Sequence, residues 1–184
     1  MDSSEIALVV VDVQRAFDDH AYWSPTGRRD NPGCEANVAA LLAAWRGPVV
    51  LVRHDSTEDG SPLAPEHPGN AFKDVVTGEP DLLVSKRTNS AFYGDPDLHA
   101  WLQERGIGSI ALCGIQTNHC VETTARMGGN LGYDVQFVID ACHTFDRRSP
   151  DGEIVAAEEL SRATATSLHG EFATVVRTAD VLSP

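Results

Sequence analysis

Short, nearly continuous runs of apolar and β-branched residues recur along the chain, and they constrain its fold more than any other feature. A strand with one solvated face alternates apolar and polar residues, whereas runs without that alternation suit a parallel sheet covered on both faces. Amphipathic stretches of helix length separate the runs, and this alternation predicts an α/β, doubly wound fold. The predicted strands are residues 6–11, 49–53, 82–85, 109–113, 135–139 and 173–176. The predicted helices are residues 35–46, 97–105, 118–129 and 153–169.

The chain has the length of a single domain. At 184 residues it is long enough to bury a substantial core, and no repeat, low-complexity tract or linker indicates a second one. We therefore expect one domain over residues 1–184. The proline-rich residues 56–69 are predicted to form a long loop inside it, and loops of this kind often line binding sites.

Charge and hydropathy exclude several classes of function. With 14 basic against 27 acidic residues the formal net charge is −13, which repels phosphate backbones, so we expect no nucleic-acid partner. No apolar run reaches the roughly 18 residues of a transmembrane helix, so we expect no membrane partner. The first residues lack the features of a signal peptide, and a cytoplasmic location is the resulting expectation.

Polar residues with catalytic potential follow the predicted strands. In open α/β sheets, ligands bind beyond the carboxyl ends of the strands, near the point where the strand order reverses. Asp12 follows the first strand, His54 the second and Lys86 the third. The fourth strand leads to Cys120, at the start of a predicted helix. A carboxylate, an ammonium group and a thiol are therefore expected to meet at one edge of the sheet.

These groups could form a nucleophilic centre. Helix-terminal N–H groups and the helix dipole would lower the pKa of the Cys120 thiol, and the same N–H groups could hold an oxyanion. Asp12 would accept the thiol proton and later return one to a departing amine, while Lys86 would hydrogen-bond Asp12 and favour its negative charge. Each residue alone also has a structural explanation, as a packing cysteine, a strand-end cap and a solvated lysine. Without disulfide spacing, the other cysteines are interpreted as packing residues: Cys34, Cys113 and Cys142.

Three segments of the sequence carry a resemblance that decides between these interpretations. They are ALVVVDVQRAF, SKRTNSAF and CGIQTNHCVETTARMGGNLGYDV, in that order. Together they strongly resemble the isochorismatase-like cysteine hydrolases, a superfamily with nicotinamidases, N-carbamoylsarcosine amidohydrolases, ureidoacrylate amidohydrolases and isochorismatase itself. The resemblance runs from about residue 6 to about residue 176. It implies a six-stranded parallel sheet with helices on both sides.

The resemblance also assigns roles to individual residues. The catalytic aspartate, lysine and cysteine of the family fall on Asp12, Lys86 and Cys120. A cis peptide bond of the family corresponds to the bond between Ile115 and Gln116. By the same resemblance, the backbone N–H groups of Gln116 and Cys120 would form the oxyanion hole.

The implied reaction is attack of a cysteine thiolate on a carbonyl, with ammonia or an amine as leaving group. Water then hydrolyses the resulting thioester. Isochorismatase itself cleaves a vinyl ether and has a different residue at the nucleophile position. The presence of Cys120 therefore favours amidohydrolase chemistry, on an amide, carbamoyl or similar C–N bond of a small molecule.

A resident metal or other cofactor is not expected. Nicotinamidases of the superfamily carry a metal site after the second strand, with an Asp-x-His arrangement and a further histidine. The corresponding residues here are His54-Asp55, and the next histidine is His67 in the proline-rich loop. A metal site needs three or more convergent ligands, and this pattern does not supply them.

Substrate contacts are harder to assign. Aromatic side chains often line small-molecule pockets, so Phe17 and Phe92 are expected to contact the substrate together with His54 and Gln116. His54 could equally be a hydrogen-bonded structural residue. Tyr22 and Trp23 could instead lie in the interface of a homo-oligomer, a dimer or tetramer, which the resemblance implies. Two further histidines lie near the predicted site. His119 is interpreted as a packing residue, and His143 has no assigned role.

Other functions remain open. A non-hydrolytic binding protein or a thiol-redox protein on the same scaffold is the main alternative, although intact Asp12, Lys86 and Cys120 favour catalysis. A nucleotide-dependent oxidoreductase is disfavoured, because the first strand is followed by Asp-Val-Gln-Arg instead of a glycine-rich turn. The substrate itself is not predicted.

Overall fold

A six-stranded parallel sheet forms the centre of the structure, a computed structural model that describes residues 6–182. The strand order is β3-β2-β1-β4-β5-β8, and every neighbouring pair runs parallel. The predicted α/β, doubly wound, six-stranded fold is therefore confirmed. The strands are β1 (Ile6–Val11), β2 (Val49–His54), β3 (Leu82–Lys86), β4 (Ser109–Ile115), β5 (Asp134–His143) and β8 (Thr174–Val176).

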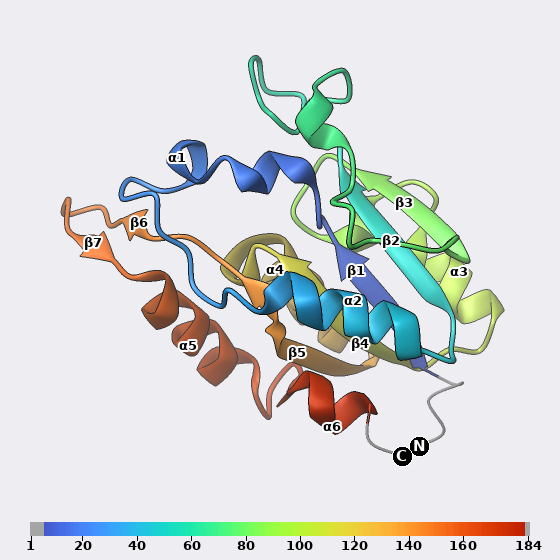
Figure 1. Ribbon diagram of the computed structural model, residues 1–184. Coiled ribbons are helices and arrows are strands. Elements are labelled where there is room, and N and C mark those ends of the chain that lie inside the picture. Colours follow the sequence, from blue (N-terminus) through green and yellow to red (C-terminus); the bar gives the residue numbers. More distant parts are fainter. Residues whose placement is uncertain (1–5, 183–184) are drawn as a thin grey trace.

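Helices cover both faces of this sheet (Figure 1). On one face, α2 (Cys34–Ala44) packs with α6 (Thr178–Leu182), while α3 (Leu98–Glu104) and α4 (Glu122–Asn130) lie on the other. α5 (Ala157–Leu168) packs beside α4 and against β5. None of the helices within residues 6–182 is long and apolar enough to cross a membrane.

The central strand is β1, and its surroundings explain its sequence. It pairs with β2 on one side and β4 on the other, and all six of its residues are buried. Gly114 allows β4 to approach, because a Cβ at this position, where φ is 130°, would overlap the carbonyl oxygen of Val11. After β1 the chain continues to β2, on one side of β1 in the sheet. After β4 it continues to β5, in the opposite direction along the sheet. The strand order therefore reverses between β1 and β4, which is where ligands bind in sheets of this kind.

Short elements and one long loop surround the carboxyl edge of the sheet. They are α1 (His20–Trp23) and three 3₁₀ turns, Arg15–Asp18, Pro68–Asn70 and Ala91–Tyr93. The predicted loop over residues 56–69 is free of helix and strand until its final 3₁₀ turn. The side chain of Asn70 ties it down by donating to the carbonyl oxygens of Leu63 at 2.8 Å and His54 at 3.0 Å.

The helix predicted over residues 153–169 begins later than expected. Ile154–Val155 (β7) pairs antiparallel with Arg147–Arg148 (β6) in a hairpin outside the main sheet. The helix α5 starts at Ala157, whose backbone N–H donates to Asp146 Oδ1 at 2.9 Å. The predicted start was wrong because this cap comes from eleven positions earlier in the chain, which helical periodicity does not reveal.

Two other predicted elements also differ. The helix predicted over residues 118–129 is divided into a π-helical turn, Thr117–Val121, and α4. The fifth strand ends at His143 instead of residue 139, and its register against β4 shifts between Leu112 and Gly114. Every other predicted boundary lies within one or two residues of the observed one.

Candidate active site

A buried ion pair lies at the carboxyl edge of the sheet. Lys86, the last residue of β3, donates from Nζ to Asp12 Oδ2 at 2.6 Å, and both side chains are fully buried. The same ammonium lies 3.0 Å from His54 Nδ1 and 3.1 Å from the carbonyl oxygen of Thr88. A lysine ammonium has three N–H donors, so these three acceptors satisfy it completely. It follows that His54 Nδ1 is the accepting nitrogen and that the ring proton is on Nε2.

The backbone around Asp12 holds its carboxyl group at the strand end. Asp12 has a φ of 53°, in the left-handed region that few residues other than glycine adopt. Its N–H donates to the carbonyl oxygen of Val52 at 2.9 Å, and its own carbonyl accepts from the N–H of Gln14 at 2.8 Å. The side chain of Gln14 in turn accepts from the N–H of His54 at 2.9 Å. Asp12 and His54 are thus fixed relative to each other through Gln14.

Cys120 brings a thiol to this pair. It lies in the π-helical turn after β4 and is 8% exposed. A carboxylate oxygen of Asp12, a ring nitrogen of His54 and the Sγ of Cys120 lie within 4.8 Å of one another. Asp12 Oδ1 is buried and has no hydrogen-bond partner within residues 6–182. Asp12 therefore has a free acceptor for the proton of the thiol.

The electrostatics of the site differ from the expectation for Cys120. Burial raises the pKa of the Cys120 thiol, and the Asp12 carboxylate raises it further, while Lys86 opposes both. The thiol is therefore protonated at rest, whereas the sequence predicted a lowered pKa. Burial alone would lower the pKa of Lys86, but Asp12 and Cys120 raise it overall, so the ammonium stays charged. Burial and the Lys86 charge lower the pKa of His54, which keeps its imidazole neutral.

The backbone before Cys120 is unusual. The peptide bond between Ile115 and Gln116 is cis. The carbonyl oxygen of Gln116 accepts from the N–H groups of His119 at 3.1 Å and Val121 at 3.3 Å. Gln116 and Cys120 both line the same cavity. That their own N–H groups form an oxyanion hole stays a prediction.

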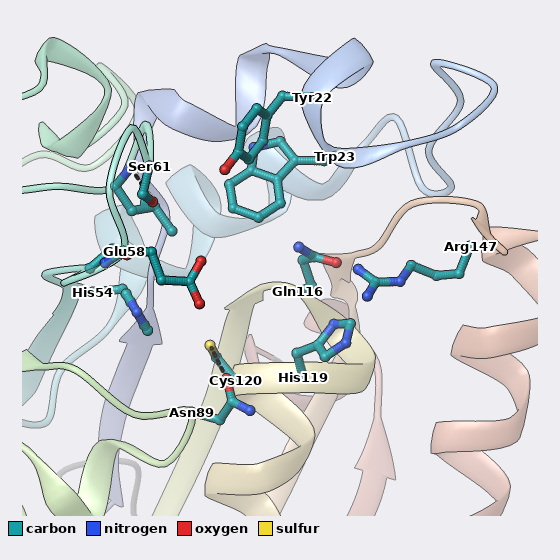
Figure 2. Close-up of a pocket in the computed structure, with 12 residues that line it drawn as sticks. Tyr22, Trp23, His54, Glu58, Ser61, Asn89, Gln116, His119, Cys120 and Arg147 are labelled. Atoms are coloured by element: carbon teal, nitrogen blue, oxygen red, sulfur yellow. Dashed lines mark hydrogen bonds between the residues drawn. The ribbon is translucent and has the colours of Figure 1, made fainter. Parts of the chain in front are cut away.

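A cavity of about 250 Å³ opens above the thiol, and Figure 2 shows the side chains around it. This volume suits a small molecule. The walls come from α1, the loop after β2, the segment after β3, the π-helical turn and β6. The lining residues are Tyr22, Trp23, His54, Ser56, Glu58, Ser61, Leu63, Asn89, Gln116, His119, Cys120 and Arg147.

Comparison with known proteins places this arrangement in a family. The isochorismatase domain model matches residues 6–180. The chain belongs to the isochorismatase family. A solved structure described as a hydrolase of this family from Chromobacterium violaceum superposes with a TM-score of 0.91 at 37% identity, over 99% of this chain and 94% of that one.

Two curated relatives extend the comparison. The isochorismatase family protein YrdC of Bacillus subtilis (strain 168) is 34% identical over 181 residues, 96% of this chain and 94% of that protein. The ureidoacrylate amidohydrolase RutB of Methylobacterium radiotolerans is 31% identical over 183 residues, 78% of this chain and 69% of that protein. The chain is thus an isochorismatase-family hydrolase.

The isochorismatase-family site brings together most, but not all, of the residues predicted to form it. Asp12, Lys86 and Cys120 meet as expected, with His54 and Gln116 in the same cavity. The predicted substrate contacts at Phe17 and Phe92 are not found in the cavity wall. Phe17 is 2% exposed and lies behind Trp23, with ring centroids 4.7 Å apart, and Phe92 stacks on Tyr133 at 5.7 Å.

The aromatic wall comes instead from Tyr22 and Trp23, which the sequence left open as interface residues. Trp23 is held by its indole N–H, which donates to the carbonyl oxygen of Ala16 at 2.8 Å. His119 also lines the cavity, although it was interpreted as a packing residue. A π-helical turn spaces its residues differently from an α-helix, so His119 and Cys120 can both reach the cavity.

His143 lies apart from the cavity. It ends β5, is fully buried, and has no hydrogen-bond partner on either ring nitrogen within residues 6–182. Its Nε2 lies 3.8 Å from Glu35 Oε1. Burial lowers the pKa of His143 to about 3, so its ring is neutral. The structure therefore gives His143 a core position rather than a substrate contact.

The donor set near Cys120 does not fit a resident metal ion. Asp12, His54 and Cys120 are ligand-type residues at close range. However, the Lys86 ammonium already binds Asp12 Oδ2 and His54 Nδ1, and its positive charge beside both side chains disfavours a second cation. His67 Nδ1 accepts from the N–H of Gly69 at 2.9 Å and is not among the cavity-lining residues. A metal ion beside Cys120 would therefore be repelled by the charge of this ammonium.

Several lining residues were not predicted from the sequence. Asn89 is part of the SKRTNSAF segment, and its Oδ1 lies 3.5 Å from Cys120 Sγ. Its place in that segment was a usable signal. Glu58 and Arg147 lie in a loop and a two-residue strand, where no periodic pattern marks them.

Proposed function

We propose that this protein is a metal-independent cysteine hydrolase that cleaves an amide, carbamoyl or similar C–N bond of a small molecule through a Cys120 thioester. The observation that carries the proposal is the free acceptor of Asp12 beside the cavity-lining thiol. A thiol that is protonated at rest needs a base at this position. The similarity to a ureidoacrylate amidohydrolase supports a C–N bond as the target.

In the first half of the reaction, Asp12 removes the proton of Cys120 as Sγ attacks the substrate carbonyl carbon. The N–H groups of Gln116 and Cys120 stabilise the negative oxygen of the tetrahedral intermediate. Asp12 then gives its proton to the leaving nitrogen, the C–N bond breaks, and ammonia or an amine departs. The acyl group remains on Sγ as a thioester.

In the second half, Asp12 removes a proton from water, and the resulting hydroxide attacks the thioester carbonyl. The C–S bond breaks, the carboxylic or carbamic acid leaves, and the proton returns to the thiolate. Lys86 donates to Asp12 Oδ2 at 2.6 Å and holds the carboxyl group in place for the proton transfers. His54 can offer its Nε2–H to the substrate, since its Nδ1 faces Lys86.

The test is ammonia release from a panel of small amides, ureido acids and N-carbamoyl compounds. We expect the wild-type protein to act on at least one compound and Cys120→Ala to act on none. Cys34→Ala is the matched control, because Cys34 is buried in α2 and does not line the cavity. Acid-quenched reactions examined by mass spectrometry should show the acyl group on the Cys120 peptide. Full activity in folded Cys120→Ala would overturn the proposal.

A thiol-redox or purely binding role is the competing function. Redox-sensing thiols are accessible and have a low pKa, whereas Cys120 is buried and its pKa is raised. A panel without any turnover, combined with reversible oxidation of Cys120 by mild peroxide, would favour the redox role. The small-molecule substrate, the homo-oligomer, the cytoplasmic location and the lack of nucleic-acid or membrane partners stay predictions.

A further inference from the structure

The cavity above Cys120 carries opposite charges on opposite walls. Figure 2 shows the carboxylate of Glu58 reaching in from the loop after β2, near His54 and Cys120. The guanidinium of Arg147 reaches in from β6 on the other side, near His119 and Gln116. The two side chains face the same small space from elements far apart in the sequence.

Neither charge is neutralised by the protein. Within residues 6–182, the carboxylate of Glu58 and the guanidinium of Arg147 make no ion pair, either with each other or with another residue. By contrast, Lys86 is paired with Asp12, and Arg53 is paired with Asp55 at 3.0 Å. Two unpaired, opposite charges in a substrate cavity are available to complementary charges on a ligand.

We propose that the substrate is a small zwitterion, with a carboxylate bound by Arg147, a cationic group placed by Glu58, and its scissile carbonyl over Cys120. The inference rests on the proposed hydrolase function. A planar guanidinium can bind a carboxylate through two parallel hydrogen bonds, which fixes its orientation as well as its charge. The volume of about 250 Å³ limits the whole substrate to roughly the size of an amino-acid amide.

The two charges should contribute unequally. Arg147 is partly buried, whereas Glu58 is exposed on its loop. Solvent screens an exposed charge, so the contact to Glu58 should be the weaker one. Loss of Arg147 is therefore expected to change substrate preference more than loss of Glu58.

The first experiment compares kcat/KM for four kinds of compound that share a terminal –CO–NH₂ group. Asparagine and glutamine carry both charges, N-carbamoylglycine only the anion, glycinamide only the cation, and propionamide neither. We expect the doubly charged amides to be the best substrates. In Arg147→Gln the ratio of kcat/KM for N-carbamoylglycine to that for propionamide should fall about tenfold or more. In Glu58→Gln the glycinamide-to-propionamide ratio should fall about two- to fivefold.

Matched controls separate a local contact from a general change in charge. Arg148→Gln removes the neighbouring arginine, whose guanidinium donates to the carbonyl oxygen of Gly152 and does not line the cavity. Asp59→Asn removes the acidic residue next to Glu58, which likewise does not line the cavity. Both controls should keep the wild-type ratios. Ratios that shift equally in the controls would overturn the proposal.

A second experiment does not depend on turnover. The rate of alkylation of Cys120 is measured with anionic iodoacetate and neutral iodoacetamide, with Cys120→Ser as the blank. The iodoacetate-to-iodoacetamide ratio should fall in Arg147→Gln and rise in Glu58→Gln. Unchanged ratios in both variants would refute the charge selection even if the hydrolase is active. Shifted ratios without any amide turnover would refute the proposed hydrolase function and leave the charged binding site standing.

Discussion

The buried pair of Asp12 and Lys86 and the rim of the cavity are built in contrasting ways. Asp12 and Lys86 stand at the carboxyl ends of β1 and β3, are fully buried, and are held by backbone and side-chain hydrogen bonds. The rim residues Tyr22, Glu58 and Arg147 come from a single-turn helix, a loop and a two-residue strand, and they are exposed or partly exposed. The rigid sheet thus positions Asp12 and Lys86, whereas short irregular elements shape the cavity above Cys120.

The two regions also differ in how much a substitution should cost in stability. A buried ion pair is expensive to disturb, because removal of one partner leaves an uncompensated charge without solvent. An exposed rim residue can be exchanged at little cost, because water replaces its contacts. Substitutions in the two regions should therefore separate: strand-end changes alter both rate and stability, and rim changes alter substrate preference alone.

The largest effect is expected for Asp12→Asn. The amide has nearly the same shape but does not accept the thiol proton, so kcat should fall about 10²–10⁴-fold, the usual contribution of general acid–base catalysis. Steady-state kinetics on the best amide of the panel measures this loss. Since Cys120 is protonated at rest, a variant that retains most of its kcat would show that another group removes the proton.

The next effect is on stability. Lys86→Met leaves the Asp12 carboxylate buried without its partner and should lower the free energy of unfolding by about 3–5 kcal/mol. The double variant Asp12→Asn/Lys86→Met removes both charges and should recover a large part of that loss. Urea denaturation of the three proteins measures both steps. If Lys86→Met were as stable as wild type, the Asp12–Lys86 pair would have to be solvated.

A smaller, pH-dependent effect is expected at His143. Burial, opposed by Glu35, lowers its folded pKa to about 3 from an ordinary value of 6.5, so the unfolded chain binds this proton more tightly. The stability that depends on a neutral His143 is fully present above pH 6.5. The free energy of unfolding then falls as the pH falls toward 3, with a slope of up to about 1.4 kcal/mol per pH unit.

His143→Leu should therefore flatten the acid loss of stability while leaving the protein folded at neutral pH, because both ring nitrogens of His143 lack partners within the described residues. Urea titrations at pH 7, 6, 5 and 4 measure the slope. His119→Leu, at the partly exposed rim, is the comparison and should change the slope less. Equal slopes in wild type and His143→Leu would contradict the assignment.

The smallest effect on stability is expected for Tyr22→Ala. Tyr22 is 52% exposed, so the free energy of unfolding should change by no more than about 0.5 kcal/mol. Because its ring lines the cavity, KM should rise while kcat stays near its original value. Kinetics and urea denaturation on one preparation test both statements. A large loss of stability would place Tyr22 in the supporting structure rather than in the rim.

Much of the fold could be predicted because the strands are nearly continuous apolar runs. β1 is six buried residues long and was expected with the same bounds. The start of α5 could not be predicted in this way, because its cap is Asp146 and the residues before it pair as β7. Local periodicity reports which face of an element is buried, but it does not report hydrogen bonds from distant residues.

The candidate site, like the fold, could be predicted only in part. The positions of Asp12, Lys86 and Cys120 after predicted strands indicated that they meet, because parallel strands deliver their carboxyl ends to one edge, and the resemblance to a known family decided it. The cavity wall was not predictable. Phe17 was chosen for its aromatic ring, yet it packs behind Trp23, and Arg147 had no signal at all.

The sequence by itself determined the order of strands and helices and which polar groups stand at the strand ends, because both follow from local hydrophobic pattern. Only the tertiary structure decided that Lys86 satisfies Asp12 and His54 together, that burial keeps Cys120 protonated, and that Glu58 and Arg147 face each other across one cavity. The physical reason is that desolvation and charge pairing depend on distances between segments remote in the chain, and those distances exist only once the chain has packed.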